Sequence, residues 1–220
     1  MRRQAAPEAD TGLRRHEGYP VGLLHRAWQS CLLTGLALGL GACGSPPVNF
    51  YTLTSPAAVP AIPDSTADDY RVLVGPVTVP DMVDRPQMVV RVGSHQMMLM
   101  DQHRWAQPLK SEIPTVIAAN LSKLLGTREV TVDAGKSGGS LRVRVDVQRF
   151  DSVPGDGAIL EAYWSVASIG GKDIKTGRFA AHVPVVQGPP YAALAQAHGK
   201  ALEALSEELA AAIRTQRTKQ

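Results

Sequence analysis

The chain has 220 residues, a formal net charge of +3 and an apolar content of 44%, which suit one folded domain with an extension and argue against a disordered chain. Residues 1–43 hold five arginines against three acidic residues, a net charge of +2, which leaves +1 for residues 44–220. Because a nucleic-acid surface needs basic residues clustered on the folded part, this distribution excludes nucleic acid as a partner.

The N-terminal region has the pattern of a cleavable bacterial lipoprotein signal. An uncharged stretch, mainly apolar in its second half, runs from Arg26 to a cysteine and is shorter than the roughly 20 residues that a membrane-spanning helix needs. It ends in an aliphatic residue, two small residues and the cysteine, namely Leu40, Gly41, Ala42 and Cys43. We therefore predict that residues 1–42 are a signal peptide cleaved before Cys43. Translation would begin at Met1 or near Val21.

Cys43 is the predicted attachment site of a lipid. Its thiol would receive a diacylglycerol group and its new amino terminus an acyl chain, and three acyl chains suffice for stable anchoring; no other cofactor is expected. Gly44 stands where an aspartate would commonly retain a lipoprotein in the inner membrane, so we expect an outer-membrane protein that faces the periplasm. The alternative interpretation is that Cys43 is a small apolar residue in a buried helix.

A tether is predicted next, over residues 43–69. Its five prolines indicate a linker of modest stiffness. Within it, residues 49–54 (NFYTLT) have the aromatic and β-branched composition of a strand, which we place at a sheet edge.

Residues 70–220 are predicted to form the periplasmic domain, and its first half contains strands and one helix. Residues 70–79 favour a strand with a bulge or an edge position at Gly75 and Pro76, and residues 87–92 and 95–100 favour a hairpin. Apolar residues then recur at helical spacing from Leu109 to Leu125. We expect Pro114 to kink this helix or to mark its first turn, and Gly126 to end it.

The second half predicts a meander and a final helix. A short strand at 128–133 precedes residues 140–150, which alternate between apolar and polar side chains and so indicate one buried face. Two further strands follow after glycine-rich turns, and a helix is predicted from Tyr191 to about Arg214. The expected fold is α+β, a single domain in which a mostly antiparallel, or mixed, sheet packs against two amphipathic helices.

The sequence contains no recognisable catalytic set. Residues 135–139 (GKSGG) spell G-x-S-x-G, but a strand is predicted after them and not the helix that a nucleophile elbow needs. The histidines are not spaced as metal ligands. His198 falls on the apolar stripe of the last helix and is interpreted as a core or boundary histidine. We therefore expect a protein that is not an enzyme and holds no metal.

Methionine is concentrated in one region, because five of the six methionines lie between Met82 and Met100. Met97, Met98 and Met100 share one predicted strand and would point to both of its faces. One interpretation is core filling. The other is an adaptable apolar surface for a second protomer, a partner protein or acyl chains, and a copper site is a third, weaker one.

In three segments the chain resembles the ABC-type transport auxiliary lipoproteins. These are NFYTL (49–53), which follows the lipobox at residues 40–43, VLVGPVTVPDMVDRPQMVVRVG (72–93) and RWAQPLKSEIPTVIAANLSKLL (104–125). The lipobox is the run of an aliphatic residue, two small residues and cysteine described above. The most specific part is the run that leads into the first helix, containing Trp105, Ala106, Pro108 and Leu109. The resemblance implies a structural role for this motif, in which Trp105 packs against the first helix and sets the angle of the methionine hairpin.

The same resemblance implies a function and partners. It implies a periplasmic component of a lipid-transport system that works with an MCE-domain protein, which bridges the two membranes, and with an inner-membrane ABC permease and ATPase. Exposed sheet edges would also allow a homo-oligomer. Two other classes of protein stay open, a lipoprotein that binds a small apolar ligand itself and an envelope structural or assembly lipoprotein.

Overall fold

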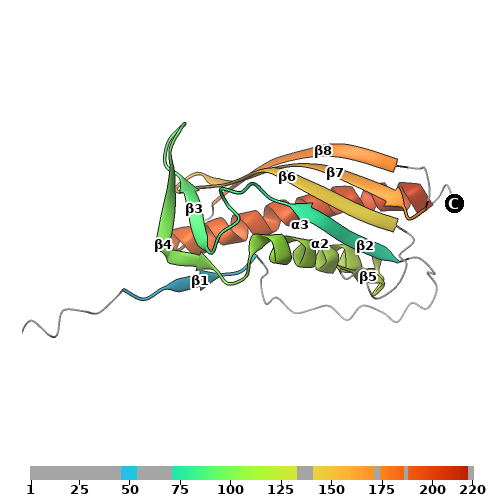
Figure 1. Ribbon diagram of the computed structural model, residues 1–220, viewed down its shortest axis with the longest axis horizontal. Helices are drawn as coiled ribbons and strands as arrows, with labels where there is room; N and C mark the ends of the chain where they lie inside the picture. Colours follow the sequence, from blue (N-terminus) through green and yellow to red (C-terminus); the bar gives the residue numbers. More distant parts are fainter. Residues whose placement is uncertain (1–45, 54–70, 133–140, 171–173, 186–187, 218–220) are drawn as a thin grey trace, which may run out of the picture. The chain divides into compact units, whose positions relative to one another are not determined.

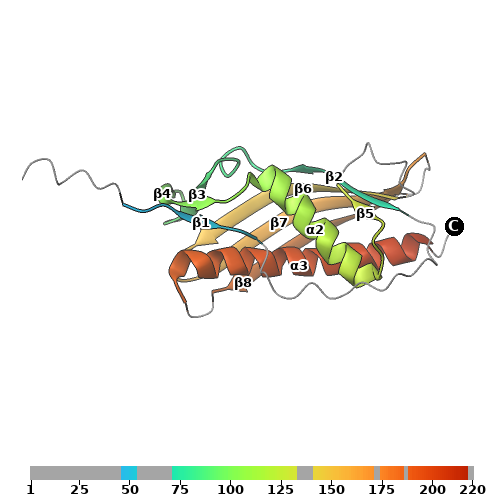
Figure 2. The same ribbon diagram turned by 90° about the horizontal axis from the view of Figure 1, so that it is seen from below.

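In the computed structural model, the described strands form one sheet, and two helices cover one of its faces (Figures 1 and 2). The structure describes residues 46–53, 71–132, 141–170, 174–185 and 188–217. The strands are β1 (Asn49–Tyr51), β2 (Val72–Thr78), β3 (Gln87–Arg91), β4 (Met97–Trp105), β5 (Val130–Thr131), β6 (Leu141–Val153), β7 (Gly157–Ser168) and β8 (Ile174–Pro184). The helices are α2 (Leu109–Leu125) and α3 (Pro190–Arg217). Residues 47–220 form one compact unit, and its strands and helices confirm the predicted α+β fold.

The sheet is mixed, which is the second of the two alternatives that the sequence left open. Its β6–β7–β8 part is the predicted antiparallel meander, and β3 and β4 form the predicted antiparallel hairpin. The pairs β1–β4, β2–β5, β2–β6 and β3–β6 are parallel. Parallel neighbours need a crossover connection, and the hairpin together with α2 provides it between β2 and β6.

The long strand β6 organises the sheet. Along one edge it pairs with β7 over its whole length, from Leu141 to Val153. The opposite edge is shared, because β2 pairs with the first half of β6 and β3 pairs near its end, where Val90 lies opposite Ser152. The β3–β4 hairpin and β1 therefore lie at one end of the sheet, and the start of β8 lies at the other (Figure 1).

Alternation along the strands determines which face is buried. Every second residue of β6 from Leu141 to Val147 is buried, and those between are exposed or half-buried, as the sequence predicts. This apolar face meets α3, which packs against β6, β7 and β8, and α2, which packs against β2 (Figure 2). The largest fully buried side chains come from these elements: Met88, Leu109, Ile113, Ile117, Leu121, Leu141, Leu160, Leu194, Leu202, Leu205, Leu209 and Ile213.

The helix α2 begins and ends where its sequence signals lie. Pro108 is its N-cap and accepts backbone hydrogen bonds from Ser111 and Glu112. Gly126 ends it in the left-handed conformation, with φ of 66°, where a glycine has no Cβ to clash. Pro114 lies beyond the first turn, inside the helix, so it does not mark the helix start. Neither of the described helices combines the length and the apolar run that crossing a bilayer requires.

Two other local predictions concern strands. At Gly75 and Pro76, β2 has the expected irregularity, because its register with β6 shifts between Val74 and Val77. The strand expected at 95–100 is longer and runs from Met97 to Trp105, so the family motif begins inside β4.

The predicted signal peptide, Cys43 and residues 54–69 of the tether lie outside the described residues.

Candidate interaction surfaces

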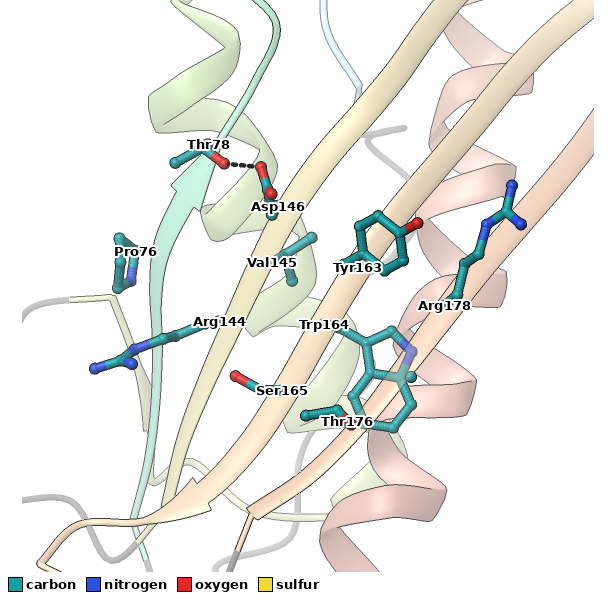
Figure 3. Close-up of a pocket in the computed structure, with 11 residues that line it drawn as sticks. Pro76, Thr78, Arg144, Val145, Asp146, Tyr163, Trp164, Ser165, Thr176 and Arg178 are labelled. Atoms are coloured by element: carbon teal, nitrogen blue, oxygen red, sulfur yellow. Dashed lines mark hydrogen bonds between the residues drawn. The ribbon is translucent and has the colours of Figure 1, made fainter.

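The face of the sheet opposite the helices carries an open groove of about 740 Å³ (Figure 3). Its side chains come from two rows of paired residues on β2, β6, β7 and β8. One row holds Arg144, Ser165 and Thr176, and the next holds Thr78, Asp146, Tyr163 and Arg178. Tyr163 is 52% exposed, so an aromatic ring stands between two arginines on a face that the helices leave uncovered.

Next to this groove the same face carries a network of ion pairs. The Asp151 carboxylate accepts hydrogen bonds from Arg91 Nε at 2.8 Å and Arg149 Nε at 2.6 Å. Arg149 and Arg178 both pair with Glu161. Burial acts to raise the pKa of Asp151, but the hydrogen bonds from the two arginines outweigh it and lower the pKa. These charged side chains therefore brace the end of β6 against β3, β7 and β8.

The β3–β4 hairpin projects from the end of the sheet and carries the predicted methionine surface (Figure 1). Met98 and Leu99 are each 45% exposed. Met97 and Met100 are half-buried and pack against the core, and the Tyr191 hydroxyl donates a hydrogen bond to Met100 Sδ. The two interpretations of the methionines thus apply to different residues, with core packing at Met97 and Met100 and an exposed apolar surface at Met98.

The base of the hairpin is held by a buried aromatic cluster. Trp105 is 4% exposed, and its ring makes edge contacts with Phe150 of β6 and His198 of α3. The resemblance implied packing against the first helix, whereas the ring contacts of the indole are with β6 and the last helix. His198 is fully buried and stacks on Phe150, and its Nε2 is hydrogen-bonded to Ser152 Oγ at 2.9 Å. Burial lowers the pKa of His198 to about 3 against the attraction of Asp151, so its imidazole is neutral.

The N-terminal segment is fixed into the fold at this end of the sheet. The strand β1 pairs with β4, and the Tyr51 carbonyl accepts a hydrogen bond from Ala106 N–H. Leu53 is 4% exposed, and its N–H donates to Glu112 Oε1 at 2.8 Å. The Leu53 carbonyl lies so close to Gly199 of α3 that a Cβ there would be 2.6 Å away. These contacts clamp residues 49–53 between β4, α2 and α3.

We predict that Glu112→Ala destabilises the domain by about 1–3 kcal/mol, because it leaves the buried N–H of Leu53 without an acceptor. Burial is the main cause of the raised pKa of Glu112, and the hydrogen bond from Leu53 opposes it. Glu112→Gln keeps an oxygen in this position and should cost much less. Urea unfolding of the two variants measures the difference, and equal losses would contradict a role for this hydrogen bond.

The structure brings together residues that sequence reasoning did not select. Tyr163 and Arg178 come from different strands and meet only through the β7–β8 register. Glu112 and Gly199 are far apart in the chain and meet at Leu53. The one sequence signal for the groove was the polar face of the alternating strands. Throughout the described ranges, no three side chains of His, Cys, Asp or Glu converge as metal ligands would.

Comparisons with known proteins agree with this geometry. The fold is similar to that of two crystal structures, each 19% identical in sequence. One is an uncharacterized protein, with a TM-score of 0.63, covering 76% of this chain and 99% of its own. The other is a Xanthomonas campestris protein of family DUF330, with a TM-score of 0.54, covering 74% of this chain and 91% of its own. No curated protein sequence matches the chain.

A family model identifies the sequence more directly than these structures do. It describes the ABC-type transport auxiliary lipoprotein component and matches residues 51–210, from the end of β1 to the later turns of α3. The match includes the motif at Trp105, Ala106, Pro108 and Leu109, the methionine hairpin and the groove. The chain therefore belongs to the family of ABC-type transport auxiliary lipoprotein components.

Proposed function

We propose that this protein is a non-catalytic auxiliary component of an intermembrane lipid-transport system of the MCE and ABC type, anchored to the outer membrane by lipid on Cys43. The observation that carries the proposal is the family match over residues 51–210. The lipobox at residues 40–43 supports the anchor, and Gly44 supports the outer membrane as its location. The partners would be an MCE-domain protein that spans the periplasm and, through it, a permease and an ATPase.

The docking surface for the MCE-domain protein would be the exposed part of β4 next to the tip of the β3–β4 hairpin. Met98 and Leu99 present flexible and branched apolar side chains there, and methionine adapts to partners of irregular shape. The aromatic cluster beneath the hairpin fixes how it projects. The groove at Tyr163 is a second uncovered surface, and its size also suits a small apolar ligand.

Site-specific cross-linking in intact cells tests this proposal. We expect a photo-reactive phenylalanine analogue in place of Met98 to capture an MCE-domain protein in the outer-membrane fraction. The same analogue in place of Glu203, which is exposed on α3, is the matched control and should not capture it. If Met98 captures no transport protein and the delipidated protein retains phospholipid, the chain is instead a lipoprotein that binds an apolar ligand itself. Capture of assembly proteins only would support the envelope-assembly class.

A pair of alanine variants separates the two roles of the methionines. With the photo-reactive residue placed at the equally exposed Leu99, Met98→Ala should weaken capture of the partner. It should leave stability unchanged, because the Met98 side chain is 45% exposed. Met100→Ala should destabilise the domain by roughly 1–2 kcal/mol, because it removes a half-buried side chain that contacts Tyr191. Thermal unfolding and the cross-linking yield measure the two effects. A loss of stability without a loss of association in Met98→Ala would contradict the docking role.

A further inference from the structure

We propose that Val48, Phe50 and Arg104 form a membrane-contact patch, through which the folded domain touches the outer-membrane bilayer beside its own anchor. The inference rests on the proposed acylation of Cys43. It adds a second attachment point and a defined orientation, neither of which follows from a lipid anchor alone.

The three residues of the membrane-contact patch share one face at the sheet edge. Phe50 is 65% exposed and Val48 is 39% exposed, and two-residue spacing places both on the same side of an extended chain. Phe50 pairs with Arg104 in the β1–β4 register, so the guanidinium side chain lies on the same face. Tyr51 points the other way, where its hydroxyl is hydrogen-bonded to His103 Nδ1 at 2.8 Å. Phe50 is therefore directed away from the body by strand geometry.

The length of chain between the anchor and this patch is short. Phe50 is seven positions after Cys43, and a fully extended chain spans at most about 3.6 Å per residue, or about 25 Å here. The domain cannot release β1 to lengthen this segment, because the contacts of Leu53 with Glu112 and Gly199 hold β1 in place. An acylated Cys43 thus keeps the membrane-contact patch within about 25 Å of the lipid anchor. This distance is close to the thickness of one bilayer leaflet with its headgroups.

The chemistry of the patch suits a phospholipid bilayer rather than a protein groove. An exposed aromatic side chain enters the apolar boundary of the headgroup region, and a neighbouring cation attracts anionic headgroups. The hydrogen bond that the structure gives Arg104 runs from Nε to the Asp101 carbonyl. Within the described part of the chain, that bond leaves the outer guanidinium nitrogens of Arg104 to meet phosphate groups.

Fluorescence of the acylated protein in vesicles tests the membrane-contact patch. The variant Phe50→Trp is reconstituted in vesicles of phosphatidylethanolamine and phosphatidylglycerol, with and without bromine on the acyl chains. We expect its emission to shift to shorter wavelength in vesicles and to be quenched by the brominated lipids. Trp105 and Trp164 are buried, so the unsubstituted protein provides their background.

The matched control is Ile174→Trp. Ile174 is 62% exposed, close to the 65% of Phe50, but it lies at the start of β8, at the opposite end of the sheet (Figure 1). About ten residues of β6 separate these two ends, which is roughly 33 Å at 3.3 Å per residue. We expect no quenching at position 174. Equal quenching at both positions would overturn the proposed orientation.

Mass spectrometry of Cys43 in the same sample separates the inference from the proposed function. If Cys43 is acylated and Phe50→Trp is not quenched, the membrane-contact patch is wrong and the anchored lipoprotein stands. If the emission shift of Phe50→Trp depends on protein concentration and not on bromine, a second copy of the chain covers the patch, which also overturns the inference. If Cys43 is unmodified, both proposals fall.

Discussion

Replacing Trp105 by alanine is expected to destabilise the domain by about 3–5 kcal/mol, the usual range for removing a buried tryptophan. The side chain is 4% exposed and has Phe150 and His198 against its ring. Its removal leaves a cavity where β4, β6 and α3 meet, and close-packed interiors relax only partly around such a space. Urea unfolding followed by circular dichroism measures the loss.

Trp105→Phe is the matched control for this substitution, because it keeps an aromatic ring and fills part of the cavity. We expect its cost to be less than half that of Trp105→Ala. A loss below about 1 kcal/mol in the alanine variant would show that the indole is not part of the core. Trp105 would then be a candidate contact for a partner, and the packing role implied by the family motif would be wrong.

Acidification is expected to destabilise the protein through His198. Burial lowers the pKa of His198 to about 3 in the folded state, whereas an unfolded histidine has a pKa near 6.5. The unfolded chain therefore binds one more proton than the folded one between these values. The stability that His198 contributes is present above pH 6.5 and is lost as the pH falls. The loss between pH 7.5 and pH 5 should be about 2 kcal/mol.

A variant that lacks only this histidine isolates its contribution. His198→Gln can still reach Ser152, and its stability should depend less on pH between 7.5 and 5. Glu112 acts in the opposite direction, because its raised pKa makes the folded state gain protons as the pH falls, and its effect is common to both proteins. The free energy of unfolding at each pH, compared between the two proteins, gives the His198 part. Identical pH dependence in both would contradict a neutral, buried His198.

The elements of this fold were predictable where the local pattern was strong. The alternation in β6, the helical spacing from Leu109 to Leu125 and the glycine at the end of α2 each depend on neighbours within a few residues. The pairing of strands was not predictable in the same way. Parallel pairs join segments far apart in the chain, such as Val72 with Leu141, and alternation alone does not distinguish them from a meander.

For the candidate surfaces, the sequence indicated residue types and the structure decided their surroundings. The sequence selected Met97, Met98 and Met100 as a group, but only the packing around β4 exposes Met98 and half-buries the other two. It interpreted His198 as a core residue, which is confirmed. It had no signal for Phe50 beside Arg104, because that contact depends on the β1–β4 register.

The sequence by itself determined the family, the element types and the core stripe of each helix, because periodicity and short motifs are encoded in adjacent residues. The tertiary structure alone decided which strands are neighbours, which sheet face stays uncovered and how β1 is clamped at Leu53. Those features follow from contacts between distant segments, whose free energy depends on how the whole core packs rather than on any local preference.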